Sequence, residues 1–250
     1  MGEPVDYAFL HGGGQGSWVW DETVAALKAQ AGDGFGRAVA LDVPGCGTKR
    51  GRQTDAIGID EIADELVADI ERAGMREVVL VGHSQAGCVL PAMAERRPGL
   101  FRRLVYVSCS MPLPGQTVQQ MIGSGVHGGN PDEVGWPLDP ATTTMRDRYT
   151  VMFCNDMAPD EATAFLAKLG HDGWPMQSYT ETRWTFDTMG AVPTTYVVCL
   201  RDGILPTRWQ EIFAGRFKAA RRVSIDAGHQ AMNTRPHALA EILRHEAAER

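Results

Sequence analysis

Residues 78–87, VVLVGHSQAG, join a short apolar run to a serine flanked by small residues. A β-branched apolar run of this length is typical of a buried strand, and the segment after Ser84 has the composition of a helix. A serine at a tight strand-to-helix turn matches the pattern of a nucleophile elbow, which presents its hydroxyl at the edge of a sheet. Gly82 and Ala86, backed by Gly87, meet the need for small side chains where strand and helix come close. The competing interpretation is an ordinary turn in which Ser84 only caps a helix.

Similar apolar runs recur along the chain and alternate with segments of helical period. This alternation predicts right-handed crossovers and a mostly parallel sheet with helices on both faces, which is an α/β fold. The clearest helix is expected over residues 58–74, and Pro91 should kink the helix expected over residues 86–98. The expected strands are YAFL (7–10), AVALDVP (38–44), EVVLVG (77–82), RLVYVS (103–108), TTYVVCL (194–200) and RRVSID (221–226), and further helices are expected over 20–30, 207–217 and 236–250.

The composition fits one globular domain that acts on a small molecule. The chain has 250 residues, a hydrophobic content of 44% and a formal net charge of −7. This length lies within the range of single α/β domains. Because the chain has no block of basic residues, a nucleic acid or an anionic membrane is disfavoured as a partner. A small neutral or cationic ligand is easier to reconcile with the negative charge.

The cysteines and the N-terminal segment indicate the cellular setting. Five cysteines are scattered along the chain without a CxxC pair, so we expect reduced thiols, no zinc site and no redox pair. The first ten residues carry no Lys or Arg, and their apolar run is too short for a signal peptide or for a membrane span of about 20 residues. We therefore expect a soluble, cytoplasmic protein without a metal or another cofactor.

The alternation of strands and helices breaks between residues 111 and 188. This stretch is rich in Gly, Pro, Thr and Trp and contains a helical segment, DEATAFLAKLG. Long insertions in compact domains are most often lids or binding loops, and the tryptophans of this stretch argue against a disordered linker. We expect a core formed by residues 1–110 and 189–250, with residues 111–188 inserted as a cap within a single domain.

A serine nucleophile needs a base, and His229 has the best position among the seven histidines. It follows the last expected strand and should therefore lie at the same edge of the sheet as Ser84. The base in turn needs a carboxylate that fixes its tautomer and stabilises its charged form. Asp202 follows the penultimate expected strand and is the preferred candidate. Asp226 is the alternative acid, closer to His229 in sequence.

The segment HGGGQGSW, residues 11–18, follows the first expected strand and could stabilise an oxyanion. Glycines let backbone N–H groups approach a substrate closely, so we assign one donor to Gly12 or Gly13 and the other to the N–H of Gln85. A glycine run after a strand could instead bind phosphate. The segment lacks both nucleotide-binding patterns, GxxxxGK[ST] and GxGxxG with its distant acid, which argues against a phosphate site.

With these motifs, the sequence resembles the α/β-hydrolase superfamily over nearly its whole length, and within it the branch of plant methyl esterases, hydroxynitrile lyases and related bacterial esterases. The resemblance rests on FLHGGGQGSWVW, LDVPGCG, VGHSQAG, CLRDGILP and AGHQAMNTRP, with a cap that contains MFCNDMAPDEATAFL. It implies a cofactor-free serine hydrolase with Ser84, His229 and Asp202 as its catalytic triad, acting on a small carboxylic ester or lactone.

Two departures from the branch bear on the chemistry. Lyases of this branch carry Thr and Lys where this chain has Gly12 and Gln230, which disfavours lyase chemistry. A Ser/His base-catalysed lyase and a receptor-like protein with slow or no turnover remain the alternatives, and a homodimer is left open. The residues expected to shape the substrate pocket are His11, Trp136, Trp174, Met176 and Trp184.

Overall fold

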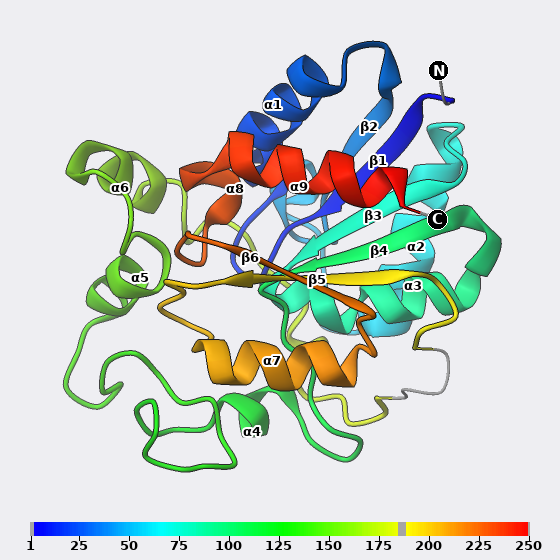
Figure 1. Cartoon of the computed structure of the whole chain (residues 1–250). Coiled ribbons are helices and arrows are strands. Elements are labelled where there is room, and N and C mark those ends of the chain that lie inside the picture. The colour runs from blue at the N-terminus through cyan, green and yellow to red at the C-terminus, as the bar shows by residue number, and fades with distance from the viewer. Residues whose placement is uncertain (1–2, 185–188, 250) are drawn as a thin grey trace.

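The computed structural model describes residues 3–184 and 189–249. Six strands form one sheet in the order β2-β1-β3-β4-β5-β6, and every neighbouring pair is parallel (Figure 1). All six overlap expected runs, so the predicted α/β sheet is confirmed. The strands are β1 (Val5–Leu10), β2 (Phe35–Leu41), β3 (Val78–His83), β4 (Phe101–Val107), β5 (Thr194–Cys199) and β6 (Arg221–Ile225).

Helices cover both faces of the sheet and bury two apolar layers against it. Helices α1 (Asp21–Ala31) and α9 (Pro236–Ala248) pack on one face. Helices α2 (Ile59–Arg72), α3 (Leu90–Arg96) and α7 (Thr207–Arg216) pack on the other (Figure 1). The apolar stripe that predicted α2 is buried along its whole length, because residues three and four apart share one helix face.

The segment after β3 differs from the expected kinked helix. Residues Ser84–Cys88 form a 3-10 turn, and α3 begins only at Leu90 with Pro91 in its first turn. A proline in the first turn lacks an N–H that would have no partner there in any case, and its fixed φ suits a helix start. Pro91 therefore starts a helix instead of kinking one.

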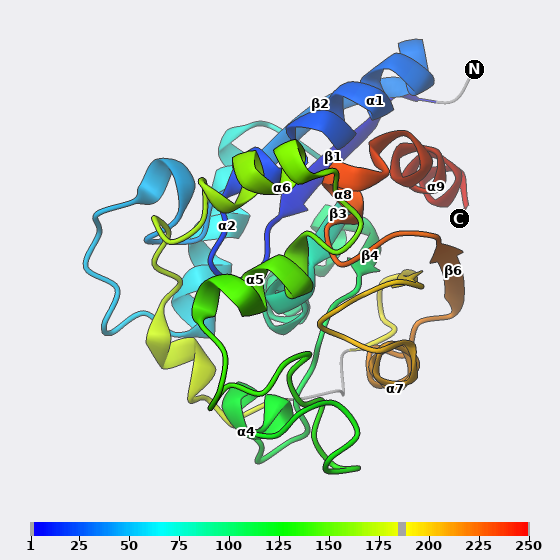
Figure 2. The same cartoon turned by 90° about the vertical axis from the view of Figure 1, so that its left-hand side faces the viewer.

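The segment expected as an insertion, residues 111–188 and called the inserted segment below, contains in its described part helices α4 (Val118–Ile122), α5 (Met145–Phe153) and α6 (Pro159–Leu166) and the 3-10 turn Met176–Tyr179. Figure 2 shows α5 and α6 in front of the sheet, on the side of the strands' carboxyl ends. In the described part of this segment the only β pairing is an isolated bridge between Val126 and Trp136. The predicted cap boundary falls on residues 185–188, which lie outside the described residues, as do residues 1–2 and 250 of the predicted core.

The remaining short elements connect these parts. They are 3-10 turns at Ser17–Trp20, Gly32–Gly34, Gly47–Lys49 and Pro98–Leu100, and the one-turn helix α8 (Ala231–Thr234).

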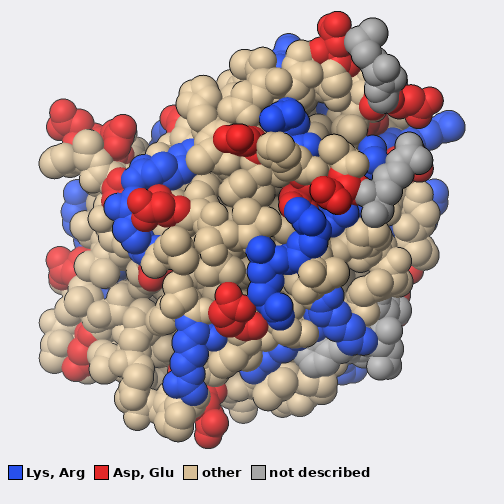
Figure 3. Space-filling model, in the orientation of Figure 1, with Lys and Arg blue, Asp and Glu red and all other residues tan. Residues whose placement is uncertain are grey.

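Among residues 3–184 and 189–249, no helix is both long and apolar enough to cross a membrane. On the face that carries α7 and α9, basic and acidic side chains are mixed rather than segregated (Figure 3).

Candidate active site

The register of the sheet brings the loops that carry the candidate residues to one edge. Leu10 at the end of β1 pairs with Gly82 of β3, so the glycine segment and the Ser84 turn leave the sheet side by side. Cys199 at the end of β5 pairs with Ile225 at the end of β6. The loops that carry Asp202 and His229 therefore also begin next to each other, because the carboxyl ends of parallel strands meet at one edge.

The Ser84 turn has the strained geometry of a nucleophile elbow. Ser84 has a φ of +54°, in the left-handed region that non-glycine residues rarely adopt, and it is half-buried. A Cβ on Gly82 would lie 2.7 Å from Leu90 Cδ1, and one on Gly87 would lie 2.5 Å from the Ser110 carbonyl oxygen. Packing around the turn therefore leaves no room for side chains at these two positions.

His229 and Asp202 form a buried hydrogen-bonded pair. The His229 Nδ1–H donates to Asp202 Oδ2 at 2.6 Å, and both side chains are inaccessible to solvent. The Ser108 hydroxyl donates to the same oxygen. The N–H groups of Ile204 and Leu205 donate to Asp202 Oδ1 at 2.6 and 2.8 Å. Four donors thus fix the carboxylate, and the carboxylate fixes the imidazole tautomer.

The alternative acid, Asp226, points away from this pair. Its side chain is 75% exposed, and its carboxylate forms an ion pair with Arg201 at 2.8 Å. It therefore does not contact His229, although it is closer in sequence.

The second nitrogen of His229 remains available. His229 Nδ1 carries the ring proton and donates it in the hydrogen bond to Asp202, so Nε2 has a lone pair. This buried Nε2 atom has no hydrogen-bond partner among the described residues. The structure does not join it to Ser84 Oγ by a hydrogen bond. His229 is instead connected to the elbow through His83, the residue before Ser84. The His83 Nε2–H donates to the His229 carbonyl oxygen at 2.9 Å, and the centroids of the two imidazole rings are 4.4 Å apart.

His83 is held neutral beside His229. Burial, together with the charge of a protonated His229, lowers the pKa of His83 well below its usual value. Its Nδ1 is buried without a partner. Of the two neighbouring imidazoles, only that of His229 is hydrogen-bonded to a carboxylate that would stabilise a positive charge.

The glycine segment lies against the elbow. A Cβ on Gly12 would lie 2.9 Å from Ser84 Cβ, and one on Gly13 would lie 3.7 Å from Gln85 Cβ. His11 is fully buried behind this segment: its Nδ1–H donates to the Gly12 carbonyl at 2.7 Å, and its Nε2 accepts from the N–H of Val43 at 3.2 Å. Burial lowers the pKa of His11, so it stays neutral. His11 supports the loop rather than facing an open pocket.

The aromatic residues expected in the pocket lie at different depths. Trp174 is buried and meets His11 edge to face, with ring centroids 5.6 Å apart. Trp136 is half-buried and donates to the Gly123 carbonyl, whereas Trp184 is buried and donates to the Gln116 carbonyl, so both brace the inserted segment. Met176 is 62% exposed. Of these four residues, Trp174 is the one whose ring contacts His11, at the start of the glycine segment.

Four residues of the site were not singled out from the sequence. Ser108 binds the acid, and its signal was its position directly after a strand. The ring centroids of Phe153 in α5 and of His229 are 6.0 Å apart, and Asp156 accepts a hydrogen bond from the N–H of Gly228 at 2.8 Å. The inserted segment therefore contacts the loop that carries His229. The Tyr179 hydroxyl would lie 2.6 Å from a Cβ on Gly13. In the sequence, the only indication of Tyr179 was that an aromatic residue follows Met176 by three positions.

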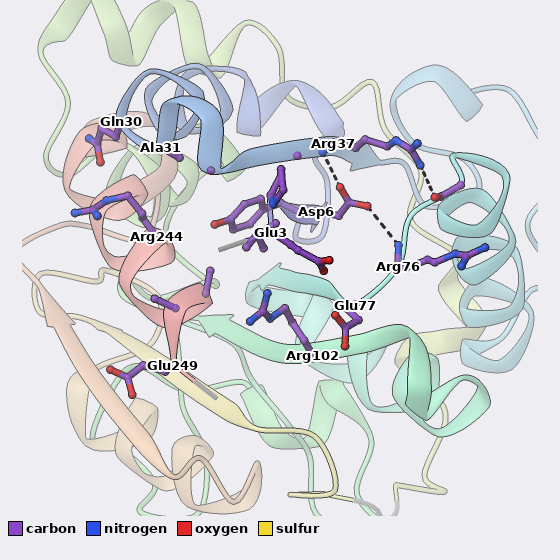
Figure 4. A pocket seen from close by; sticks show the side chains of 18 residues that line it. Glu3, Asp6, Gln30, Ala31, Arg37, Arg76, Glu77, Arg102, Arg244 and Glu249 are labelled. Atoms are coloured by element: carbon purple, nitrogen blue, oxygen red, sulfur yellow. Dashed lines mark hydrogen bonds between the residues drawn. The ribbon is translucent and has the colours of Figure 1, made fainter. Parts of the chain in front are cut away.

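A groove of about 1370 Å³ lies at the opposite, amino-terminal edge of the sheet (Figure 4). Four arginines and four carboxylates line it, so its charges balance. Asp6 points toward the backbone N–H groups of Arg37 and Arg76 and accepts hydrogen bonds from both. The groove is remote from Ser84, because it is lined by residues at the amino-terminal ends of the strands. Within residues 3–184 and 189–249, no cluster of His, Cys, Asp or Glu could hold a metal ion.

Comparison with known sequences connects this geometry to other proteins. Residues 8–242 match the alpha/beta hydrolase family. Methylesterase 10 of Arabidopsis thaliana is 25% identical over 97% of this chain and 91% of its own length. The probable esterase PIR7A of Oryza sativa subsp. indica is 36% identical over 44% of this chain, and the match spans 41% of the rice protein.

Solved structures agree with the fold. An extracellular alpha/beta-hydrolase from a Paenibacillus species has a TM-score of 0.76 at 18% identity, over 99% of this chain and 100% of that chain. The methylesterase MES16 from Arabidopsis has a TM-score of 0.74 at 18% identity, over 98% of this chain and 99% of that chain. Since the family match extends over most of the sequence and the same sheet is present, the chain belongs to the alpha/beta hydrolase family.

Proposed function

We propose that this protein is a cofactor-free serine hydrolase that cleaves a small carboxylic ester or lactone through an acyl-enzyme. The observation that carries the proposal is the buried His229–Asp202 pair. His229 Nε2 has no partner among the described residues, and the His229 ring lies 4.4 Å, between centroids, from that of His83, the residue before Ser84. Similarity to named methylesterases makes methyl esters the first substrate class to test.

In the acylation step, Ser84 Oγ attacks the acyl carbon while its proton moves to His229 Nε2. The carbonyl electron pair moves onto the oxygen, which the N–H groups of Gly12 or Gly13 and of Gln85 stabilise. When that pair returns, the bond to the alcohol oxygen breaks, and the proton on His229 moves to the leaving alkoxide.

Water then removes the acyl group by the same route. It gives a proton to His229 Nε2 as its oxygen attacks the acyl carbon, and the proton returns to Ser84 Oγ as the carboxylic acid leaves. Asp202 stays ionised throughout and stabilises the imidazolium in both steps. Gly12 and Gln230 stand at the two positions where related lyases carry Thr and Lys, which disfavours the lyase alternative.

The test is hydrolysis of short p-nitrophenyl esters and methyl esters by the wild-type protein and by Ser84→Ala. Loss of the nucleophile should lower kcat by about 10³- to 10⁶-fold. Ser110→Ala, which removes another buried serine hydroxyl near the elbow, is the matched control and should keep its activity. A fluorophosphonate should also label Ser84 in the wild-type protein. Equal turnover by the wild type and Ser84→Ala would refute the proposal, and absence of turnover and labelling would favour a receptor-like role.

A further inference from the structure

Tyr179 brings a phenol hydroxyl from the inserted segment to the glycine loop. A Cβ on Gly13 would lie 2.6 Å from Tyr179 Oη, 3.9 Å from Tyr179 Cζ and 3.7 Å from Gln85 Cβ. The hydroxyl therefore lies next to the loop that supplies one proposed oxyanion donor and close to the residue that supplies the other. Glycine at position 13 leaves the space that this approach requires.

The hydroxyl is available as a donor. It forms no hydrogen bond with another described residue, and Tyr179 is only half-buried. Burial raises the pKa of Tyr179 above its ordinary value, so the phenol keeps its proton near neutral pH. A phenol O–H without a protein partner at an acyl-transfer site can donate to a substrate oxygen.

Contacts on both sides of Tyr179 hold its segment on the core. Asp172 accepts hydrogen bonds from the Gly47 N–H at 2.6 Å and from Arg50 Nε at 2.7 Å. Glu181 accepts one from the Ile59 N–H at 2.8 Å. The Trp174 indole N–H donates to Ser178 within the segment at 2.9 Å. A donor held in place before the reaction stabilises a developing charge more effectively than a mobile one.

We propose that Tyr179 donates a third hydrogen bond to the carbonyl oxygen of the substrate, beside the backbone N–H groups of the glycine loop and of Gln85. This inference rests on the proposed function. The oxygen gains negative charge when Ser84 attacks, and the tyrosine O–H contacts it without losing its proton. The oxyanion hole then contains one donor from the inserted segment and two from the core.

The first experiment compares Tyr179→Phe with the wild type on one p-nitrophenyl ester. Because the donor acts mainly on the charged intermediate, kcat and kcat/KM should both fall by about 10- to 100-fold while KM changes little. The affinity for a trifluoromethyl ketone, which forms a charged adduct with a serine, should fall by the same factor. Tyr7→Phe, which removes a hydroxyl from the groove at the opposite edge of the sheet, is the control and should behave as the wild type.

Gly13→Ala supplies a second, steric test. Its methyl group should displace the Tyr179 hydroxyl and lower kcat, because the new Cβ comes within 2.6 Å of Oη. In the Tyr179→Phe background this methyl group has no hydroxyl to displace, so Gly13→Ala should add little further loss. Additive losses in the double variant would mean that the two residues act independently.

The outcomes separate this inference from the proposed function. If Ser84→Ala is inactive and Tyr179→Phe keeps kcat within twofold, or loses kcat without losing ketone affinity, the third donor is refuted while the serine hydrolase stands. If the wild type and Ser84→Ala are equally inactive, both proposals fall together. A matched loss of kcat and ketone affinity in Tyr179→Phe, with unchanged unfolding in urea, supports the inference.

Discussion

Replacing Asp202 by asparagine removes the charge of the proposed acid with almost no change in shape. The asparagine carbonyl can still accept the hydrogen bonds that Ile204 and Leu205 donate to Oδ1. Its NH₂ group, however, takes the place of Oδ2. In the wild-type protein Oδ2 accepts hydrogen bonds from His229 Nδ1–H and from the Ser108 hydroxyl. Since two donors cannot face each other, His229 must present the lone pair of Nδ1 and carry its proton on Nε2.

This change of tautomer sets the size of the effect. With a proton on Nε2, His229 cannot take the proton of Ser84, and the imidazolium also loses its carboxylate partner. We expect kcat to fall by about 10⁴-fold, which corresponds to about 5 kcal/mol in the activation free energy. Folding should change far less, because the buried backbone donors keep their acceptor and no cavity forms.

The assay is steady-state hydrolysis of a p-nitrophenyl ester, together with urea unfolding of the same samples. Asp226→Asn is the matched control, because it removes the other candidate carboxylate from a residue that is 75% exposed. An exposed ion pair contributes only about 0–1 kcal/mol to stability, so Asp226→Asn should keep both its kcat and its unfolding midpoint. A folded Asp202→Asn variant with more than a tenth of the wild-type kcat would refute the assignment, and a larger loss in Asp226→Asn would transfer the role.

Two further predictions concern stability. Gly82→Ala should destabilise the protein by about 1–3 kcal/mol in urea unfolding, because its Cβ would lie 2.7 Å from Leu90 Cδ1. Gly99→Ala, whose Cβ would meet nothing within 4 Å, should be close to neutral. Stability should also fall as the pH drops below about 6.5, because burial lowers the folded-state pKa of His11 and His83 and the unfolded chain then binds more protons. The slope for two such groups approaches about 2.7 kcal/mol per pH unit, and a flat urea midpoint between pH 7 and 5 would contradict this account.

The sheet and the order of the candidate residues around it were predictable from the sequence. A buried parallel strand is a short β-branched run, and its carboxyl end is known once its direction is known. Ser84, Asp202 and His229 each follow such a run, so strand pairing alone brings their loops to one edge. The choice between Asp202 and Asp226 was harder, because both follow a strand. In the structure the Asp202 side chain contacts His229, whereas that of Asp226 is 75% exposed and pairs with Arg201.

The effect of Pro91 could be predicted correctly only if the residue at which its helix begins was known. A proline kinks a helix when it lies in the interior but favours a helix when it lies in the first turn. The sequence pattern of residues 86–98 did not reveal that the first turn after Ser84 is a 3-10 turn. The position of the helix start was therefore the missing information, and it depends on the strained turn at Ser84.

The inserted segment was less predictable because its side-chain directions depend on contacts with the core. Met176 and Tyr179 are three residues apart on one 3-10 turn, where such side chains would share a face in an ideal geometry. In the structure Met176 is 62% exposed, whereas the Tyr179 hydroxyl faces Gly13. Asp172 and Glu181 attach the segment to loops more than a hundred residues earlier in the chain, and these attachments orient the turn. No periodicity within the segment encodes them, so the residue next to the proposed oxyanion hole could be identified only once the segment was placed on the core.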